Sequence, residues 1–201
     1  MLAWKFLAPG AIAPFTGIRW PAPEGSRSAP WVEGRASPGQ GVHACAAEHL
    51  PYWFDEELWE VELDGPLTRA ARQLIARRGR LVSRVHDWPA CQPEFTRACL
   101  ERTRRRAVDA LLAEGRRVEA ERLAVQTDLD ALQSAAATIA ASGFAVAGYV
   151  SDAVRRRPYP GLCAYIAANA AAAVDGQRGH DQERAIQAAW LRDRLTLDAG
   201  S

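Results

Sequence analysis

Residues 58–64, which read Leu-Trp-Glu-Val-Glu-Leu-Asp, set the character of the N-terminal half of this chain. Apolar side chains alternate there with acidic ones. Because successive side chains of a strand point to opposite faces of a sheet, the alternation predicts a half-buried β-strand. We expect Trp59, Val61 and Leu63 on one face of the strand, and Glu60 and Glu62 with Leu58 and Asp64 on the other.

Shorter segments on either side of this strand predict further strands and turns. We expect strands over residues 3–7, 16–20 and 41–45, a short strand at 31–33 within a loop over 21–40, and one or two helical turns over 46–53. Asp64-Gly65-Pro66 predicts a turn, because Gly and Pro favour turn conformations. The apolar runs 73–77 and 80–85 flank Arg78-Gly79 and predict a hairpin, with a helix as the alternative.

The pattern changes after Pro93, where apolar residues recur at helical spacing with Arg and Glu between them. We expect a helix over 93–114, with a possible continuation toward Leu132, and further helices over 129–142, 145–156, 162–174 and 181–195. Ala-rich faces allow close helix packing. The sequence therefore predicts an α+β fold: a small, mostly antiparallel sheet with a short helix in residues 1–88, then an Ala/Arg-rich helical bundle in residues 93–201.

Composition limits the classes of function. The chain has 201 residues, of which 48% are hydrophobic, and its net charge is +1, so we expect a folded core and no general affinity for nucleic acid or anionic membranes. The longest apolar stretch, 135–150, contains Gly143 and Gly148 and is too short to span a bilayer. The N-terminus lacks the pattern of a signal peptide, so we expect a cytoplasmic protein.

The stretch Gly41-Val42-His43-Ala44-Cys45 precedes an aromatic segment and the strand at 58–64. It resembles an uncharacterised family of actinobacterial and phage-encoded proteins that carry a G-[VFL]-H-A-C motif. Trp4-Lys5-Phe6 and Gln73-Leu74-Ile75-Ala76 also look like positions of that family. The resemblance covers about residues 1–88 and implies a fold, but no activity.

A weaker likeness concerns Glu60-Val61-Glu62, which is similar to the E-x-E of ADP-ribosyltransferase-like enzymes. The likeness implies that Glu60 or Glu62 is a catalytic carboxylate that stabilises an oxocarbenium-like transition state, with His43 in the pocket and NAD or a nucleotide as substrate. This chain has Lys5 on the first strand where that family has His or Arg. It has His43-Ala44-Cys45 at the family's Ser-Thr-Ser position.

His43 and Cys45 share one face of the expected strand, since they are two residues apart. With Cys91, Cys99 or His86 they would suit Zn²⁺, because imidazole and thiolate are its preferred ligands. A Cys–His nucleophile pair is a second possibility. The structural alternative is a partly buried histidine beside a cysteine that packs as a small apolar residue.

Six of the seven tryptophans lie in residues 1–88. Trp4, Trp53 and Trp59 are candidates to line a cavity in which a nucleobase or another flat ligand stacks. The alternative is that the tryptophans build the core, with Trp20 and Trp31 holding loops in place.

Charged runs have both a binding and a structural interpretation. The arginines of 102–106 and 155–157 are candidates to bind phosphates. The structural alternative is a solvated, salt-bridged face, because Glu101 and Asp109 flank the first run and the second run ends a helix, where cations favour the dipole. The acidic run 55–57 predicts an exposed turn, or a site for a divalent cation. No P-loop, G-x-G-x-x-G, G-x-S-x-G or H-E-x-x-H motif is present.

Three functions remain open from the sequence. The first is a ligand-binding or partner-binding module, whose helical half mediates assembly. The second is an enzyme of the ADP-ribosyltransferase-like type, which requires His43 and one of the two glutamates to face a common cleft. The third is a zinc-stabilised domain, which requires clustered sulfur and imidazole ligands. The sequence identifies neither cofactor, partner nor oligomeric state.

Overall fold

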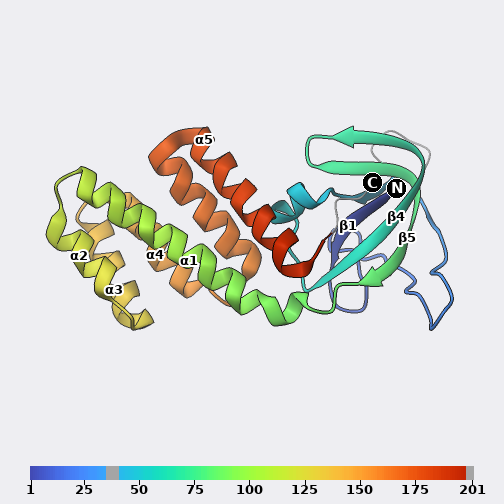
Figure 1. Cartoon of the computed structure of the whole chain (residues 1–201), viewed down its shortest axis with the longest axis horizontal. Coiled ribbons are helices and arrows are strands. Elements are labelled where there is room, and N and C mark those ends of the chain that lie inside the picture. The colour runs from blue at the N-terminus through green and yellow to red at the C-terminus, as the bar shows by residue number, and fades with distance from the viewer. Residues whose placement is uncertain (35–40, 198–201) are drawn as a thin grey trace. The chain divides into compact units, whose positions relative to one another are not determined.

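The computed structural model describes residues 1–34 and 41–197, so the predicted loop over 21–40 is described only as far as residue 34. It confirms the α+β class, with a small antiparallel sheet in the N-terminal half and helices in the C-terminal half (Figure 1). The chain forms two compact units. One comprises Met1–Cys91 with the segment that begins at Ala188, and the other comprises Gln92–Gln187.

In its described residues before α1, the first unit contains five strands and one short 3₁₀ helix. The strands are β1 (Leu2–Leu7), β2 (Val32–Glu33), β3 (Val42–Ala44), β4 (Glu57–Ala70) and β5 (Gln73–Arg84), and the 3₁₀ helix is η1 (Ala47–Tyr52). All pairings are antiparallel, in the order β1-β4-β5-β2, and β3 also pairs with β5. The predictions near 3–7, 31–33, 41–45, 46–53 and 58–64 correspond to five of these six elements.

A single long hairpin, β4–β5, forms the centre of the sheet. The predicted turn at Asp64-Gly65-Pro66 is wrong, because β4 continues through it to Ala70. The pairing shifts from Asp64 opposite Arg78 to Leu67 opposite Ala76, so β4 has an extra residue there, as in a β-bulge. Gly65 has φ 89°, which a residue without a Cβ adopts easily. The predicted hairpin at Arg78-Gly79 is also wrong, since both residues lie inside β5.

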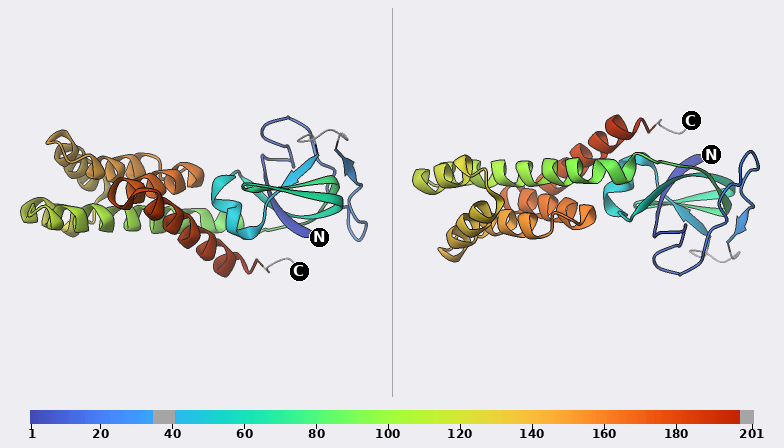
Figure 2. Two further views of the ribbon diagram at one scale, coloured as in Figure 1. Left: turned by 90° about the horizontal axis from the view of Figure 1, so that it is seen from above. Right: turned by 90° about the horizontal axis from the view of Figure 1, so that it is seen from below.

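The sheet curls back on itself at its edges. The amide of Trp4 in β1 donates to the carbonyl of Cys45, directly after β3, and the amide of Cys45 donates back to Trp4, both at 2.8 Å. The strands therefore wrap around a common interior, as Figure 2 shows for this part of the chain. The core inside includes Trp59, Val61 and Leu63, which confirms the shared face expected from their alternation.

The segment between β1 and β2 is a chain of turns. The predicted strand at 16–20 is wrong, because Arg19 alone among these residues is bridged, in an isolated bridge with Ile12. The amide of Trp20 donates to the carbonyl of Ala11 at 2.8 Å and so closes the turns into a compact loop. We call residues 8–20 the rim loop.

Five helices follow in the described part of the chain: α1 (Trp88–Ala113), α2 (Arg117–Val125), α3 (Leu129–Ala141), α4 (Ala145–Arg155) and α5 (Pro160–Leu195). The continuation of the first helix toward Leu132 is wrong, since Gly115 has φ 76° and separates α1 from α2. The two helices expected over 162–174 and 181–195 form α5, with a kink at Gly176 (φ 63°). None of the helices in the described ranges is both long and apolar enough to cross a bilayer.

The second unit contains a charged cluster in its interior. The carboxylate of Glu183 on α5 is fully buried and accepts hydrogen bonds from Arg102 Nε at 2.8 Å and from Arg106 at 2.9 Å, both on α1. Gln187 Nε2 donates to Glu183 at 3.0 Å and to the carbonyl of Ala164 at 3.0 Å. A solvated, salt-bridged face is therefore the wrong interpretation for Arg102 and Arg106, because both bind this buried carboxylate.

Candidate functional site

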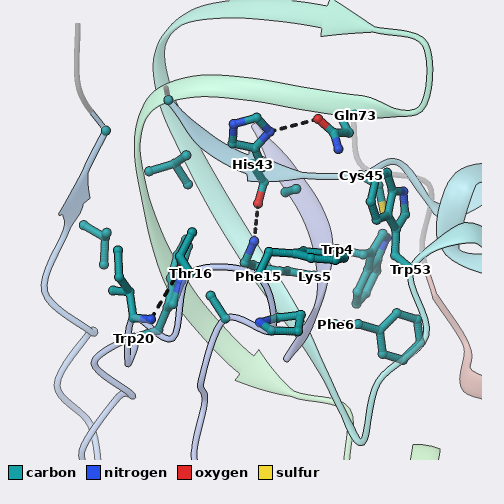
Figure 3. Close-up of a pocket in the computed structure, with 18 of the residues that line it drawn as sticks. Trp4, Lys5, Phe6, Phe15, Thr16, Trp20, His43, Cys45, Trp53 and Gln73 are labelled. Atoms are coloured by element: carbon teal, nitrogen blue, oxygen red, sulfur yellow. Dashed lines mark hydrogen bonds between the residues drawn. The ribbon is translucent and has the colours of Figure 1, made fainter. Parts of the chain in front are cut away.

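A cavity of about 690 Å³ opens within the first unit (Figure 3). Its walls come from β1, the rim loop, β2, β3 and the segment after η1. Most of the lining is apolar or aromatic, and the large contributors are Trp4, Phe6, Phe15, Ile18, Trp20 and Trp53. A concave, mostly apolar space of roughly 300–1,000 Å³ is typical of sites for small molecules.

Two of the three tryptophans predicted to bind a ligand line this cavity. Trp4 is 8% exposed, and Trp53 is partly buried with its indole N–H donating to the carbonyl of Arg72 at 3.1 Å. Trp20, which was expected to hold a loop, lines the cavity as well. The third predicted tryptophan, Trp59, lies in the core and donates its indole N–H to Glu57 Oε2 at 2.9 Å.

The rim loop presents large apolar side chains to solvent at the cavity. Phe15 is 86% exposed and Ile18 is 55% exposed, and both belong to the lining. Exposed apolar side chains that gather beside a concave apolar surface mark a place where a ligand or partner is received. Nothing in the sequence around Phe15 identified it in advance, because the turns that bring it to the cavity depend on distant contacts.

Glu57 makes the main distant contact of the rim loop. Its side chain is buried and accepts hydrogen bonds from the amides of Gly10 at 3.1 Å and Ala11 at 3.2 Å, while Arg84 lies 3.4 Å away. Burial opposes ionisation of this carboxyl, but the hydrogen bonds from Trp59, Gly10 and Ala11 and the charge of Arg84 hold its pKa below the usual value. The predicted exposed turn at 55–57 is thus wrong for Glu57.

Lys5 supplies the cationic group of the cavity wall. Alternation along β1 places it on the same face as Ala3 and Leu7, which belong to the core. Its Nζ donates to the carbonyl of His43 at 2.6 Å and lies 5.2 Å from the ring centroid of Trp20. Burial lowers the pKa of Lys5 to about 8, although the nearby Cys45 partly opposes the shift.

His43 and Cys45 occupy different environments. His43 lines the cavity, and its Nδ1 lies 2.9 Å from Oε1 of Gln73, an oxygen that only accepts hydrogen bonds. Cys45 is 2% exposed, and burial raises the pKa of its thiol to about 12, with Lys5 opposing and Glu48 reinforcing the shift. A thiol with such a pKa stays protonated near neutral pH and is a poor nucleophile.

The two glutamates of the E-x-E sequence are held on the sheet by other partners. Glu60 accepts a hydrogen bond from Ser83 Oγ at 2.9 Å, and Glu62 binds Arg80 Nε at 2.6 Å. Neither glutamate belongs to the cavity lining, whereas His43 does. The structure therefore brings His43 together with Trp4 and Trp53, and leaves both glutamates outside this group.

The cysteines offer no assembled metal site in the ranges 1–34 and 41–197. All four are free and buried there, and those ranges contain no group of three His, Cys, Asp or Glu side chains able to hold a metal ion. The zinc-stabilised domain therefore has no ligand set in this part of the chain.

Lys5 is expected to react with acetic anhydride at a rate that is half-maximal near pH 8, because its pKa is lowered to about 8 from 10.5. It is the only lysine, so peptide mass spectrometry reports this one side chain, and fragmentation separates it from the N-terminal amine. The urea-unfolded protein is the control and should show the midpoint of an ordinary lysine. A midpoint near 10.5 in the folded protein would contradict the environment described for Lys5.

Comparison with protein-family models, with curated proteins and with solved structures gives no match to this chain. The resemblance to the G-[VFL]-H-A-C family and the likeness to ADP-ribosyltransferase-like enzymes stay predictions. The cavity itself is therefore the feature from which a function is inferred.

Proposed function

We propose that the first unit is a small-molecule-binding module, which holds a flat, largely apolar ligand in the cavity beside β1 and the rim loop. The observation that carries this proposal is the cavity of about 690 Å³ lined by Trp4, Trp20 and Trp53. Aromatic rings favour stacked or edge-to-face contacts with other flat rings, and their large surfaces dominate the energetics of such sites.

The shape of the site supports a small molecule rather than a protein partner as its occupant. The apolar surface is concave, and among the described residues its polar lining is limited to a few side chains: Lys5, Thr16, Glu33, His43 and Gln73. Sites for small molecules combine apolar walls with a few polar groups that fix the orientation of the ligand. A ligand that fills the cavity would also cover Phe15, which is largely exposed in the free protein.

The proposal gives structural rather than catalytic roles to the acidic residues of the sheet. Glu60 and Glu62 bind Ser83 and Arg80, and Glu57 holds the rim loop. The ADP-ribosyltransferase-like alternative would need one of the first two to reach the same cleft as His43. The contacts of these glutamates favour binding without catalysis.

Titration with N-phenylnaphthylamine, a neutral dye that fluoresces in apolar surroundings, tests the proposal. We expect saturable binding with one site, and a roughly tenfold weaker affinity for Phe15→Ala, which corresponds to about 1.4 kcal/mol. Phe15 is 86% exposed, so its removal should leave the fold intact. Circular dichroism checks this point.

Tyr165→Ala is the matched control, because Tyr165 is an aromatic residue of α5 that is 58% exposed and does not line the cavity. It should bind the dye as the unmodified protein does. Absence of saturable binding, or equal losses in both variants, would contradict the proposed function.

A further inference from the structure

The amine of Lys5 lies at the cavity without a carboxylate beside it. In the described residues, its polar contacts are a hydrogen bond to the carbonyl of His43 and a cation–π contact with Trp20. No ion pair within residues 1–34 and 41–197 includes this amine. A cation taken out of water without a counter-ion is unfavourable, unless something else supplies the negative charge.

The ammonium group of Lys5 has N–H donors that remain for a ligand. An ammonium group has three N–H donors, and the carbonyl of His43 at 2.6 Å uses one of them. This bond and the ring of Trp20 hold Nζ at the cavity wall, where Figure 3 shows the side chain between the aromatic residues. A charged group fixed in this way is suited to orienting one end of a ligand whose remainder is apolar.

The other titratable groups near Lys5 do not replace a counter-ion. Cys45 interacts electrostatically with Lys5, and its thiol stays neutral because burial raises its pKa to about 12. His43 carries no negative charge, and its Nδ1 lies 2.9 Å from Oε1 of Gln73. Glu33 also lines the cavity, but it is exposed and lies 4.0 Å from the guanidinium of Arg78. Glu48, whose charge acts on Cys45, is exposed to water as well.

We propose that the ligand of this cavity is a monocarboxylate with an aromatic body, and that its carboxylate pairs with Lys5 while its ring packs against Trp20. The inference rests on the proposed function and adds the chemical class of the ligand. One carboxylate matches the single charge of Lys5. A phosphate would bring close to two negative charges into an apolar space where Lys5 is the one Lys or Arg among the described lining residues, and would be left unbalanced there.

Isothermal titration with the isosteric pair naphthoate and naphthamide tests this inference at pH 7. We expect naphthoate to bind the unmodified protein at least tenfold more tightly than naphthamide. Lys5→Met removes the charge and keeps an unbranched apolar chain, so it should abolish the preference and leave the affinity for naphthamide within about threefold. Arg122→Met, which removes an exposed positive charge from α2, is the matched control and should keep the preference.

A second readout does not depend on any variant. A bound carboxylate stabilises the protonated amine, so saturating naphthoate should move the midpoint of Lys5 acetylation upward from about pH 8, whereas naphthamide should not. This readout decides the question if Lys5→Met does not fold.

The outcomes separate the inference from the proposed function. Equal binding of naphthoate and naphthamide, or an unmoved acetylation midpoint under saturating naphthoate, would overturn the role of Lys5 and leave the binding module standing. Failure of both compounds and of the neutral dye to bind would overturn the proposed function and this inference with it.

Discussion

Glu183→Ala is expected to lower the free energy of unfolding of the second unit by about 3–5 kcal/mol, the usual cost of removing one partner from a buried charged cluster. Glu183 is fully buried and accepts hydrogen bonds from Arg102, Arg106 and Gln187. Without its carboxylate, two partly buried guanidinium groups lose their counter-charge while staying close together. Urea unfolding followed by circular dichroism of the helices measures the change.

Two further variants identify the cause of that loss. Glu183→Gln keeps the shape and removes the charge, so it should recover only part of the stability lost in Glu183→Ala. Glu101→Ala removes an exposed partner of Arg104 on the same helix, at 3.8 Å, and should cost below about 1 kcal/mol. If Glu183→Ala were no more harmful than Glu101→Ala, the buried cluster would not stabilise this unit.

Glu57→Ala should destabilise the first unit by about 3 kcal/mol and weaken binding of the dye, because it leaves several donors unpaired at once. The donors are the amides of Gly10 and Ala11, the indole of Trp59 and the guanidinium of Arg84. The rim loop would lose its attachment to β4. Thermal unfolding and dye titration of the same sample measure both effects. A stable variant with unchanged affinity would contradict the positioning role of Glu57.

The lowered pKa of Glu57 also makes the stability of the first unit depend on pH. Its pKa is lower in the folded protein than the usual 4.5. The folded state therefore binds fewer protons than the unfolded state, so this contribution is present above the unfolded pKa and is lost as pH falls through the folded pKa. Glu57→Gln should lose less stability than the unmodified protein as the pH falls below 4.5. Parallel acid curves for the two proteins would contradict this assignment.

The predictions that succeeded depend on local patterns. The alternation over 58–64 gave the face of β4, and the helical spacing after Pro93 gave helices close to the observed α1, α3 and α4. The turn at Asp64-Gly65-Pro66 failed because pairing with β5 on both sides carries the strand through these residues as an irregularity. A local turn preference is weaker than the pairing of two long strands.

The candidate site was foreseen in part. The abundance of tryptophan predicted Trp4 and Trp53 as cavity residues, and both line the cavity. That Trp20 lines the cavity while Trp59 lies in the core depends on how the rim loop folds, which no local sequence pattern predicts. The alternation of side chains along a strand also indicates which charged residues face the core. Glu57 lies an even number of residues from Trp59 and Val61, and therefore on the same face of β4. Lys5 likewise shares a face of β1 with Ala3 and Leu7. Both charged side chains therefore occupy core-facing positions.

The most direct test of the binding module is an NMR spectrum of the tryptophan indole N–H groups, assigned through Trp→Phe variants and recorded with and without naphthoate. Our account predicts that the signals of Trp4, Trp20 and Trp53, which line the cavity, shift more than those of the other four tryptophans. Shifts confined to Trp31 or Trp190, with the three cavity signals unchanged at saturating ligand, would contradict it.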